Sequence, residues 1–134
     1  MKRVLVVDDD PVIRRMVCLT LMDAFECVTA SDGVEALEIL KRDPQFDCVV
    51  LDYAMPVLDG GKVLTAMKAD TRLAAIPVLM LTSEESARLY RDLMRMGAAV
   101  YVYKPFERKK LKTLVSVLAG LGGRDGDDRR VAAS

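Results

Sequence analysis

Short apolar segments that stop abruptly at a polar residue recur along this chain, and they constrain its fold more than any other feature. Four segments share this form: Val4–Val7 before Asp8, Val49–Leu51 before Asp52, Leu79–Leu81 before Thr82, and Val100–Tyr103 before Lys104. Such near-continuous aliphatic and β-branched runs are typical of parallel strands covered on both faces. Because the carboxyl ends of parallel strands open onto one crevice, we expect these polar residues to surround a single point.

Strand and helix patterns alternate five times along the sequence, which predicts an α/β domain. The expected strands are residues 3–7, 27–30, 48–51, 76–81 and 100–103, and the expected helices are about 11–24, 33–43, 61–69, 83–97 and 107–119. Five such units favour an open, doubly wound parallel sheet over a closed barrel, which needs eight strands and about 250 residues.

Several residues have the chemistry of helix ends and turns. Asp10 is the expected N-cap of the first helix, and Gly97 is the expected left-handed residue after the fourth. Gly60 is expected to permit a left-handed turn before the third helix. The helical period predicts that the fourth helix buries four side chains, namely Ala87, Tyr90, Leu93 and Met94.

Length and charge limit the classes of function. The 134 residues fit one domain, which we place at residues 1–120, followed by a polar tail or linker at 121–134. Its 20 basic and 20 acidic residues balance, so nothing predicts direct binding to nucleic acid or to a membrane. The chain has no apolar run near the ~20 residues that span a bilayer, and three aspartates end the first run too early for a secretory signal. We therefore predict a cytoplasmic protein.

The sequence contains no histidine, which excludes an imidazole base or metal ligand. An odd set of three cysteines, Cys18, Cys27 and Cys48, without close pairing argues against a disulfide framework and a zinc site. We interpret Cys27 and Cys48 as small buried hydrophobic residues of strands. Cys18 falls beside the apolar stripe of the first helix.

The polar strand ends suit a divalent cation and a phosphoryl group. Asp8 and Asp9 are adjacent, and two carboxylates this close raise each other's pKa unless a cation lies between them. A hard ion such as Mg²⁺ fits that need. Asp52 is the single carboxylate that follows the central strand, where it can act as a nucleophile. Lys104 offers positive charge and Thr82 offers a hydroxyl donor to phosphoryl oxygens.

These motifs, taken together and in this order, resemble a two-component response-regulator receiver domain over about residues 2–120. The shared motifs are the acidic pair after the first strand, the aspartate after the third, Met-Pro-x-x-Asp-Gly after that, Thr-Ser after the fourth strand and Lys-Pro-Phe after the fifth. The resemblance implies a flavodoxin-like strand order, 2-1-3-4-5, in a three-layer α/β/α architecture.

The resemblance also implies roles for individual residues. Asp52 is the implied phosphoacceptor. Mg²⁺, for which Mn²⁺ can substitute, is held by Asp9, Asp52 and the backbone carbonyl of Ala54, with Asp8 acting through water. Lys104 and Thr82 contact phosphoryl oxygens, as do the backbone groups at two further positions, Ala54 and Ser83.

The implied output is a switch in partner binding. Thr82 and Tyr101 correspond to the switch residues of the family, and the face formed by helix 83–97, strand 100–103 and helix 107–119 docks the partner. The implied partners are a histidine kinase or histidine phosphotransfer protein, a downstream effector, and a second copy of the chain after phosphorylation. Such a domain is not an enzyme with a separate substrate, because it catalyses only its own phosphorylation and dephosphorylation.

Three alternatives stay open. A haloacid-dehalogenase phosphatase would use Asp8 as nucleophile in Asp8-Asp9-Asp10-Pro11-Val12, but its later acidic motif finds only Asp127-Asp128 in the polar tail. A flavodoxin needs a phosphate loop after the first strand, where three aspartates would repel the flavin phosphate. The chain is also consistent with a receiver fragment of a larger regulator or hybrid kinase.

Overall fold

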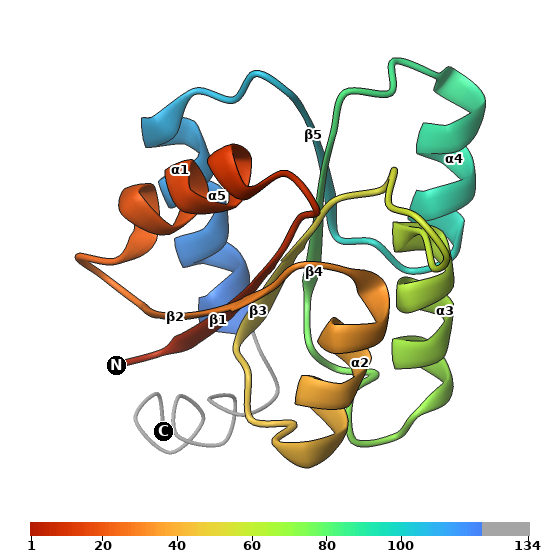
Figure 1. Cartoon of the computed structure of the whole chain (residues 1–134), viewed down its shortest axis with the longest axis horizontal. Coiled ribbons are helices and arrows are strands. Elements are labelled where there is room, and N and C mark those ends of the chain that lie inside the picture. The colour runs from red at the N-terminus through yellow and green to blue at the C-terminus, as the bar shows by residue number, and fades with distance from the viewer. Residues whose placement is uncertain (122–134) are drawn as a thin grey trace.

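The computed structural model describes residues 1–121, which form a five-stranded parallel sheet with helices on both faces (Figure 1). The strands are β1 (Arg3–Val7), β2 (Glu26–Ala30), β3 (Cys48–Leu51), β4 (Val78–Thr82) and β5 (Val100–Tyr103). Their order across the sheet is β2-β1-β3-β4-β5. The predicted doubly wound architecture and strand order are therefore confirmed, whereas the predicted tail, apart from Leu121, lies outside the described residues.

The register of the sheet aligns the carboxyl ends of its strands. Val7, the last residue of β1, pairs with both Ala30 of β2 and Leu51 of β3. At the other side of the sheet, Thr82 of β4 pairs with Tyr103 of β5. The residues that follow each of these strands consequently emerge along one edge of the sheet.

Two groups of helices cover the two faces (Figure 1). The helices are α1 (Pro11–Leu21), α2 (Gly33–Arg42), α3 (Gly60–Ala69), α4 (Ala87–Arg95) and α5 (Arg108–Leu121). Alternate strand residues divide between two apolar cores: Val4 and Val6 pack on the side of α1 and α5, and Leu5 and Val7 pack on the side of α2, α3 and α4. The continuous apolar pattern of the strands follows from this double coverage.

The predicted helix ends are only partly right. Asp10 caps α1 as expected, because its carboxylate accepts a hydrogen bond from the backbone N–H of Val12 at 2.9 Å. Helix α1 ends at Leu21 rather than at residue 24. Helix α4 begins at Ala87 rather than near residue 83, since the Ser86 side chain forms its N-cap.

The predicted inner face of α4 is wrong in two of its four residues. Leu93 is buried and Met94 packs half-buried against the core, but Ala87 is exposed and Tyr90 is 44 % exposed. The helix therefore contacts the core through a narrow stripe, and most of its surface faces solvent. Cys27 also departs from its predicted burial and is half-buried, whereas Cys48 is fully buried.

Gly60 is required for a reason other than the one predicted. Its φ angle is not left-handed; among residues 1–121 the left-handed residues are Val57, with φ of 70°, and Gly97, with φ of 111°. A Cβ atom at Gly60 would lie 2.4 Å from the backbone oxygen of Asp52. Glycine is thus needed where the start of α3 approaches the end of β3.

Within residues 1–121, no helix has the length and apolar character to cross a membrane.

Candidate functional site

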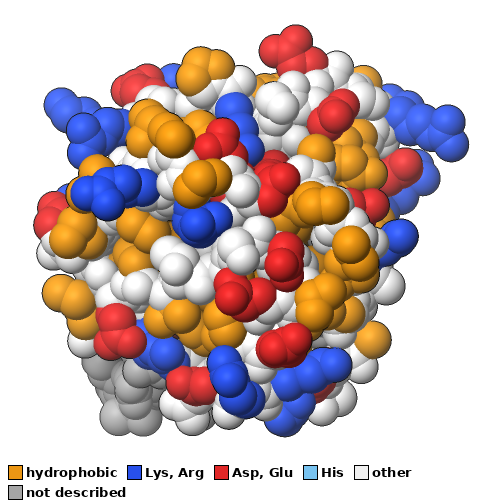
Figure 2. All heavy atoms as spheres, viewed as in Figure 1, with side chains coloured by type: hydrophobic (Ala, Val, Ile, Leu, Met, Phe, Trp, Pro, Cys, Tyr) orange, Lys and Arg blue, Asp and Glu red, His pale blue; other side chains and the backbone are white. Residues whose placement is uncertain are grey.

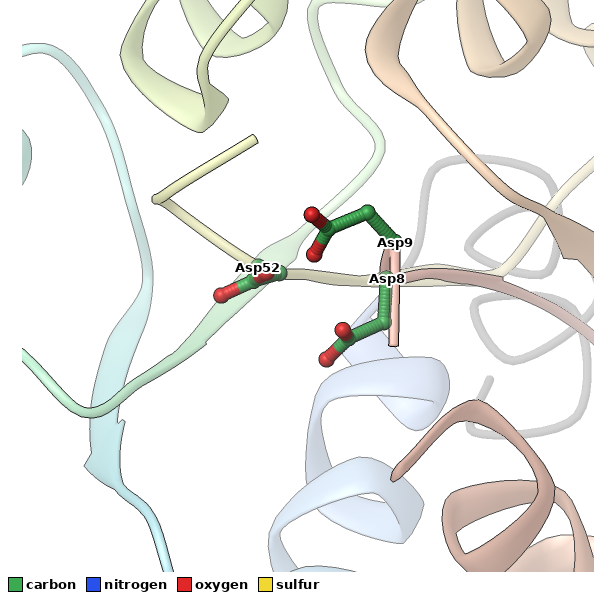
Figure 3. Close-up of side chains that lie close together, drawn as sticks. All are labelled: Asp8, Asp9 and Asp52. Atoms are coloured by element: carbon green, nitrogen blue, oxygen red, sulfur yellow. The ribbon is translucent and has the colours of Figure 1, made fainter. Parts of the chain in front are cut away.

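Three carboxylates meet at the carboxyl edge of the sheet. Asp8 and Asp9 follow β1, and Asp52 follows the neighbouring strand β3. Their nearest carboxylate oxygens all lie within 4.8 Å of one another. Figure 3 shows the three side chains gathered in one place from the ends of these two strands. The convergence expected from the strand pattern is therefore present.

The backbone fixes two of these aspartates firmly. The N–H of Asp52 donates to the carbonyl of Val7 at 2.9 Å, and the N–H of Asp8 donates to the carbonyl of Ala30 at 3.2 Å, so both residues extend the sheet hydrogen bonding. Asp8 is 2 % exposed and Asp52 is 4 % exposed, whereas Asp9 lies on the exposed rim. The site therefore has a buried floor, formed by Asp8 and Asp52, and an exposed rim at Asp9.

Lys104 supplies an ammonium group to this floor. Its Nζ lies 2.9 Å from Asp8 Oδ2 and 3.2 Å from Asp52 Oδ1. The Lys104 N–H donates to the carbonyl of Thr82 at 2.9 Å, and the Lys104–Pro105 peptide bond is cis. Burial opposes the charge of Lys104, but the hydrogen bond to Asp8 and the charges of both aspartates raise its pKa above the ordinary value.

The carboxylates outnumber the single ammonium. Burial first, and then the negative charge of Asp8, raises the pKa of Asp52 to about 7, although Lys104 opposes this shift. A cation placed among the three carboxylates would favour their ionised form and lower that pKa. A set of carboxylate oxygens is also the ligand chemistry that hard divalent ions prefer. The residues present therefore fit a divalent cation beside Lys104.

Two backbone contacts hold the β1–α1 turn in shape. The N–H of Asp10 donates to Asp8 Oδ1 at 2.9 Å, and Arg14 Nη1 donates to the backbone carbonyl of Asp8 at 2.7 Å. Arg14 was not predicted as part of the site. A basic residue on the second turn of a helix that follows an acidic strand end is the signal that points to it.

Thr82 and Tyr101 are linked to each other through Glu84 rather than to the carboxylates. Thr82 is 0 % exposed, and its hydroxyl accepts a hydrogen bond from the Glu84 N–H at 3.2 Å. The Tyr101 hydroxyl donates to the Glu84 carbonyl at 2.7 Å. This backbone role of Glu84 was not predicted. Two further predicted residues are exposed: Ala54 lies three residues after the end of β3, and Ser83 directly follows β4.

The surface around the site is uneven in charge. In the space-filling view, acidic side chains lie along the middle of the face, between the α1 and α5 side and the α3 and α4 side (Figure 2). A separate hollow of about 560 Å³ lies between α3 and α4 and is lined by Leu58, Ala66 and Leu93 among others. None of Asp8, Asp9 and Asp52 lines that hollow.

Comparison with known proteins supports one family. The profile described as the response regulator receiver domain matches residues 4–116. Chemotaxis protein CheY-3 of Vibrio cholerae is 38 % identical over 112 residues, which cover 82 % of this chain and 85 % of the relative. The solved structure of chemotaxis response regulator CheY4 of the same species has a TM-score of 0.81 and 36 % identity, and the match covers 88 % of this chain and 98 % of that one.

A longer relative matches over part of its length. Two-component response regulator ORR1 of Oryza sativa subsp. japonica is 34 % identical over 122 residues, which cover 84 % of this chain but 53 % of the relative. The chain thus spans about half the length of that protein. The family match leaves the phosphatase and flavodoxin alternatives without support. The chain belongs to the response regulator receiver domain family and is a receiver domain of two-component signalling.

Proposed function

We propose that Asp52 is the phosphoacceptor of this receiver domain. The observation that supports this role is the position of its buried carboxylate, which lies beside the Lys104 ammonium and within 4.8 Å of the oxygens of Asp8 and Asp9. Of the three aspartates, Asp52 is the one whose backbone oxygen lies against a glycine, Gly60, after the turn that follows it. The phosphoryl donor is a histidine kinase or histidine phosphotransfer protein.

The proposed ligands of Mg²⁺ are the carboxylates of Asp9 and Asp52 and the backbone carbonyl of Ala54, with Asp8 acting through water. Mn²⁺ is the proposed substitute, because it also accepts oxygen ligands. Bound Mg²⁺ supplies positive charge that neutralises the phosphoryl oxygens. The charges at the site support this assignment, because three carboxylates carry more negative charge than the single Lys104 ammonium neutralises.

In the proposed transfer, one carboxylate oxygen of Asp52 attacks phosphorus while the bond from phosphorus to the donor nitrogen breaks. Lys104 contacts Asp52 Oδ1, so we assign the attack to Oδ2. The ammonium then balances charge on the phosphoryl oxygens. The Thr82 hydroxyl and the backbone N–H groups of Ala54 and Ser83 are the proposed donors to the remaining phosphoryl oxygens.

The proposed response begins at Thr82. If its hydroxyl turns toward the phosphoryl group, the hydrogen bond from the Glu84 N–H weakens. Tyr101 is bound to the carbonyl of the same residue, so the change reaches the face made by α4, β5 and α5. Tyr90 and Tyr103 are exposed on this face. Phosphorylation thereby shifts an equilibrium between two arrangements of the loop, and it favours binding of an effector or a second copy.

The chain is proposed to catalyse only its own phosphorylation and the hydrolysis of its own acyl phosphate. Because the chain spans about half of one longer relative, the proposed effector is either a separate protein or a further domain of a larger regulator. The docking face is the same in both cases.

Incubation with acetyl phosphate and Mg²⁺ tests the proposal. We expect intact mass spectrometry to detect one added phosphoryl group on the wild-type chain and none on Asp52→Asn. The matched control is Asp32→Asn, which changes the N-cap of α2, an aspartate outside the group of three carboxylates, to another good capping residue. Equal labelling of Asp52→Asn and the control would overturn the assignment of the phosphoacceptor.

A further inference from the structure

Two cysteines that the phosphoacceptor site does not use lie on neighbouring elements. Cys18 is on the third turn of α1, and Cys27 is the second residue of β2. Both side chains are half-buried and pack against the same apolar core, which includes Val17, Leu21 and Val4. Cys27 aligns with Val4 in the sheet register, and α1 packs against both β1 and β2. The structure thus brings together two thiols that sequence spacing did not pair.

The surroundings make the two thiols chemically unequal. A side-chain hydrogen bond from Cys27 lowers the pKa of Cys18 to about 7, burial opposes the shift, and the nearby charge of Arg14 supports it. The same hydrogen bond, with burial, raises the pKa of Cys27. One sulfur therefore has thiolate character near neutral pH, and its neighbour retains its proton. This combination is typical of a reactive cysteine beside a resolving cysteine.

The third cysteine provides an internal comparison. Cys48 is fully buried in β3 and faces the same core. Burial raises its pKa to about 12. It therefore lacks both the access and the thiolate that oxidation requires, and we expect it to stay reduced when Cys18 reacts.

We propose that Cys18 and Cys27 form an oxidisable dithiol, in which a hydroperoxide converts the two thiols into a disulfide between α1 and β2. In the first step the Cys18 thiolate attacks one oxygen of the hydroperoxide, the O–O bond breaks, and a sulfenic acid and water (or an alcohol) are released after protonation. In the second step the Cys27 sulfur attacks the sulfenic sulfur, and the hydroxyl leaves as water. Overall, two thiols are oxidised by two electrons and one hydroperoxide is reduced.

The disulfide would attach α1 to the edge of the sheet. Helix α1 carries Arg14, which holds the backbone carbonyl of Asp8 at 2.7 Å. The modification site is therefore on the same helix as one support of the acidic site, but its chemistry requires none of the carboxylates. The disulfide can be tested whether or not Asp52 accepts a phosphoryl group.

The test uses the full reduced chain and one equivalent of hydrogen peroxide near neutral pH, followed by alkylation of the remaining thiols. We expect the intact mass to show one alkylated thiol and the loss of two hydrogens from the other two. Cleavage before Asp23 separates Cys18 from Cys27, so the two peptides should stay joined until a reductant is added. Cys48→Ser should form the same link.

Two further variants make the outcome decisive. In Cys27→Ser we expect a sulfenic acid on Cys18 that dimedone traps, because the resolving thiol is gone. Before oxidation, Cys18 should be alkylated at least about tenfold faster than Cys48 in the folded chain. A link that forms only in denaturant, a link that involves Cys48, or Cys18 that is oxidised without joining Cys27 would each overturn the proposal.

Discussion

The two halves of the carboxyl edge differ in how firmly they hold their residues. At the ends of β1 and β3, buried aspartates continue the hydrogen bonding of the sheet and bind the ammonium of Lys104 directly. In the other half, the side chains of Thr82, at the end of β4, and Tyr101, within β5, are linked through the backbone of Glu84, beside a helix with one buried residue. A rigid half suits chemistry that needs fixed geometry, and a loosely held half suits a response that needs movement.

The largest effect is expected from the rigid half. Lys104→Ala removes the ammonium that lies beside Asp8 and Asp52, and we expect phosphorylation by acetyl phosphate to slow by about 10²-fold. The measurement is the rate at which phosphorylated chain appears by mass spectrometry. Lys110→Ala is the matched control, because that lysine is exposed and pairs with Glu107 across one turn. Equal rates for the two variants would place Lys104 outside the chemistry.

A substitution at Asp9, on the exposed rim of the rigid half, should have a smaller effect. Asp9→Asn keeps the size of the side chain but removes one negative charge, and we expect the affinity for Mg²⁺ to fall about tenfold. Calorimetric titration of Mg²⁺ measures the change directly. Asp59→Asn is the control, because it changes an N-cap aspartate of α3 to another capping residue. An unchanged affinity in Asp9→Asn would remove this residue from the proposed ligands.

The buried carboxylate of Asp52 should also make the free energy of unfolding depend on pH. The pKa of Asp52 is about 7 in the folded chain, against an ordinary value of 3.8. Between these values the folded chain holds a proton that the unfolded chain has released, so the free energy of unfolding should fall as pH rises from about 4 to about 7. We expect Asp52→Asn to remove most of this dependence and to raise the free energy of unfolding above pH 7 by about 1 kcal/mol.

Urea unfolding over that pH range, without added divalent cation, measures this dependence. Asp32→Asn should keep the dependence of the wild-type chain. Added Mg²⁺ should stabilise the wild-type chain more than Asp52→Asn, because a ligand stabilises the state that binds it. A pH dependence that is identical in Asp52→Asn and wild type would assign the buried proton to another group.

The sequence predicts the rigid half of the edge better than the loosely held half. The bounds of β1, β3 and β5, the convergence of Asp8, Asp9 and Asp52, and the Asp10 cap were predictable, because each follows from a local change from apolar to polar residues. The start of α4 was not. Ser83 and Ser86 are both good capping residues, and the choice depends on Glu84, whose N–H donates to the nearby Thr82 hydroxyl and whose carbonyl accepts from the distant Tyr101.

Other departures have the same origin. Gly60 was expected to serve a local turn, but its requirement comes from the approach of Asp52's backbone oxygen, which only the folded chain creates. Cys18 and Cys27 have no pairing signal in their spacing, because a helix has to pack over a strand before the two thiols meet. Interactions between elements, rather than within one, account for each of these misses.

The smallest effect tests the loosely held half. Tyr101→Phe removes one hydroxyl, whose bond to the Glu84 carbonyl at 2.7 Å lies partly exposed, so we expect a loss of about 0.5–1 kcal/mol in the free energy of unfolding. Phosphorylation by acetyl phosphate should stay close to the wild-type rate, because the variant leaves Asp8, Asp52 and Lys104 in contact. Hydrogen exchange of residues 83–86 should become faster.

Tyr103→Phe is the matched control for this last change, since Tyr103 packs edge-on against Tyr101 at 5.3 Å between ring centroids and is itself exposed. It should leave the exchange of residues 83–86 unchanged. If Tyr101→Phe instead slowed phosphorylation as much as Lys104→Ala, the two halves of the edge would be one rigid unit. If both tyrosine variants left exchange unchanged, the Glu84 link would not restrain the loop, and Thr82 alone would have to carry the response.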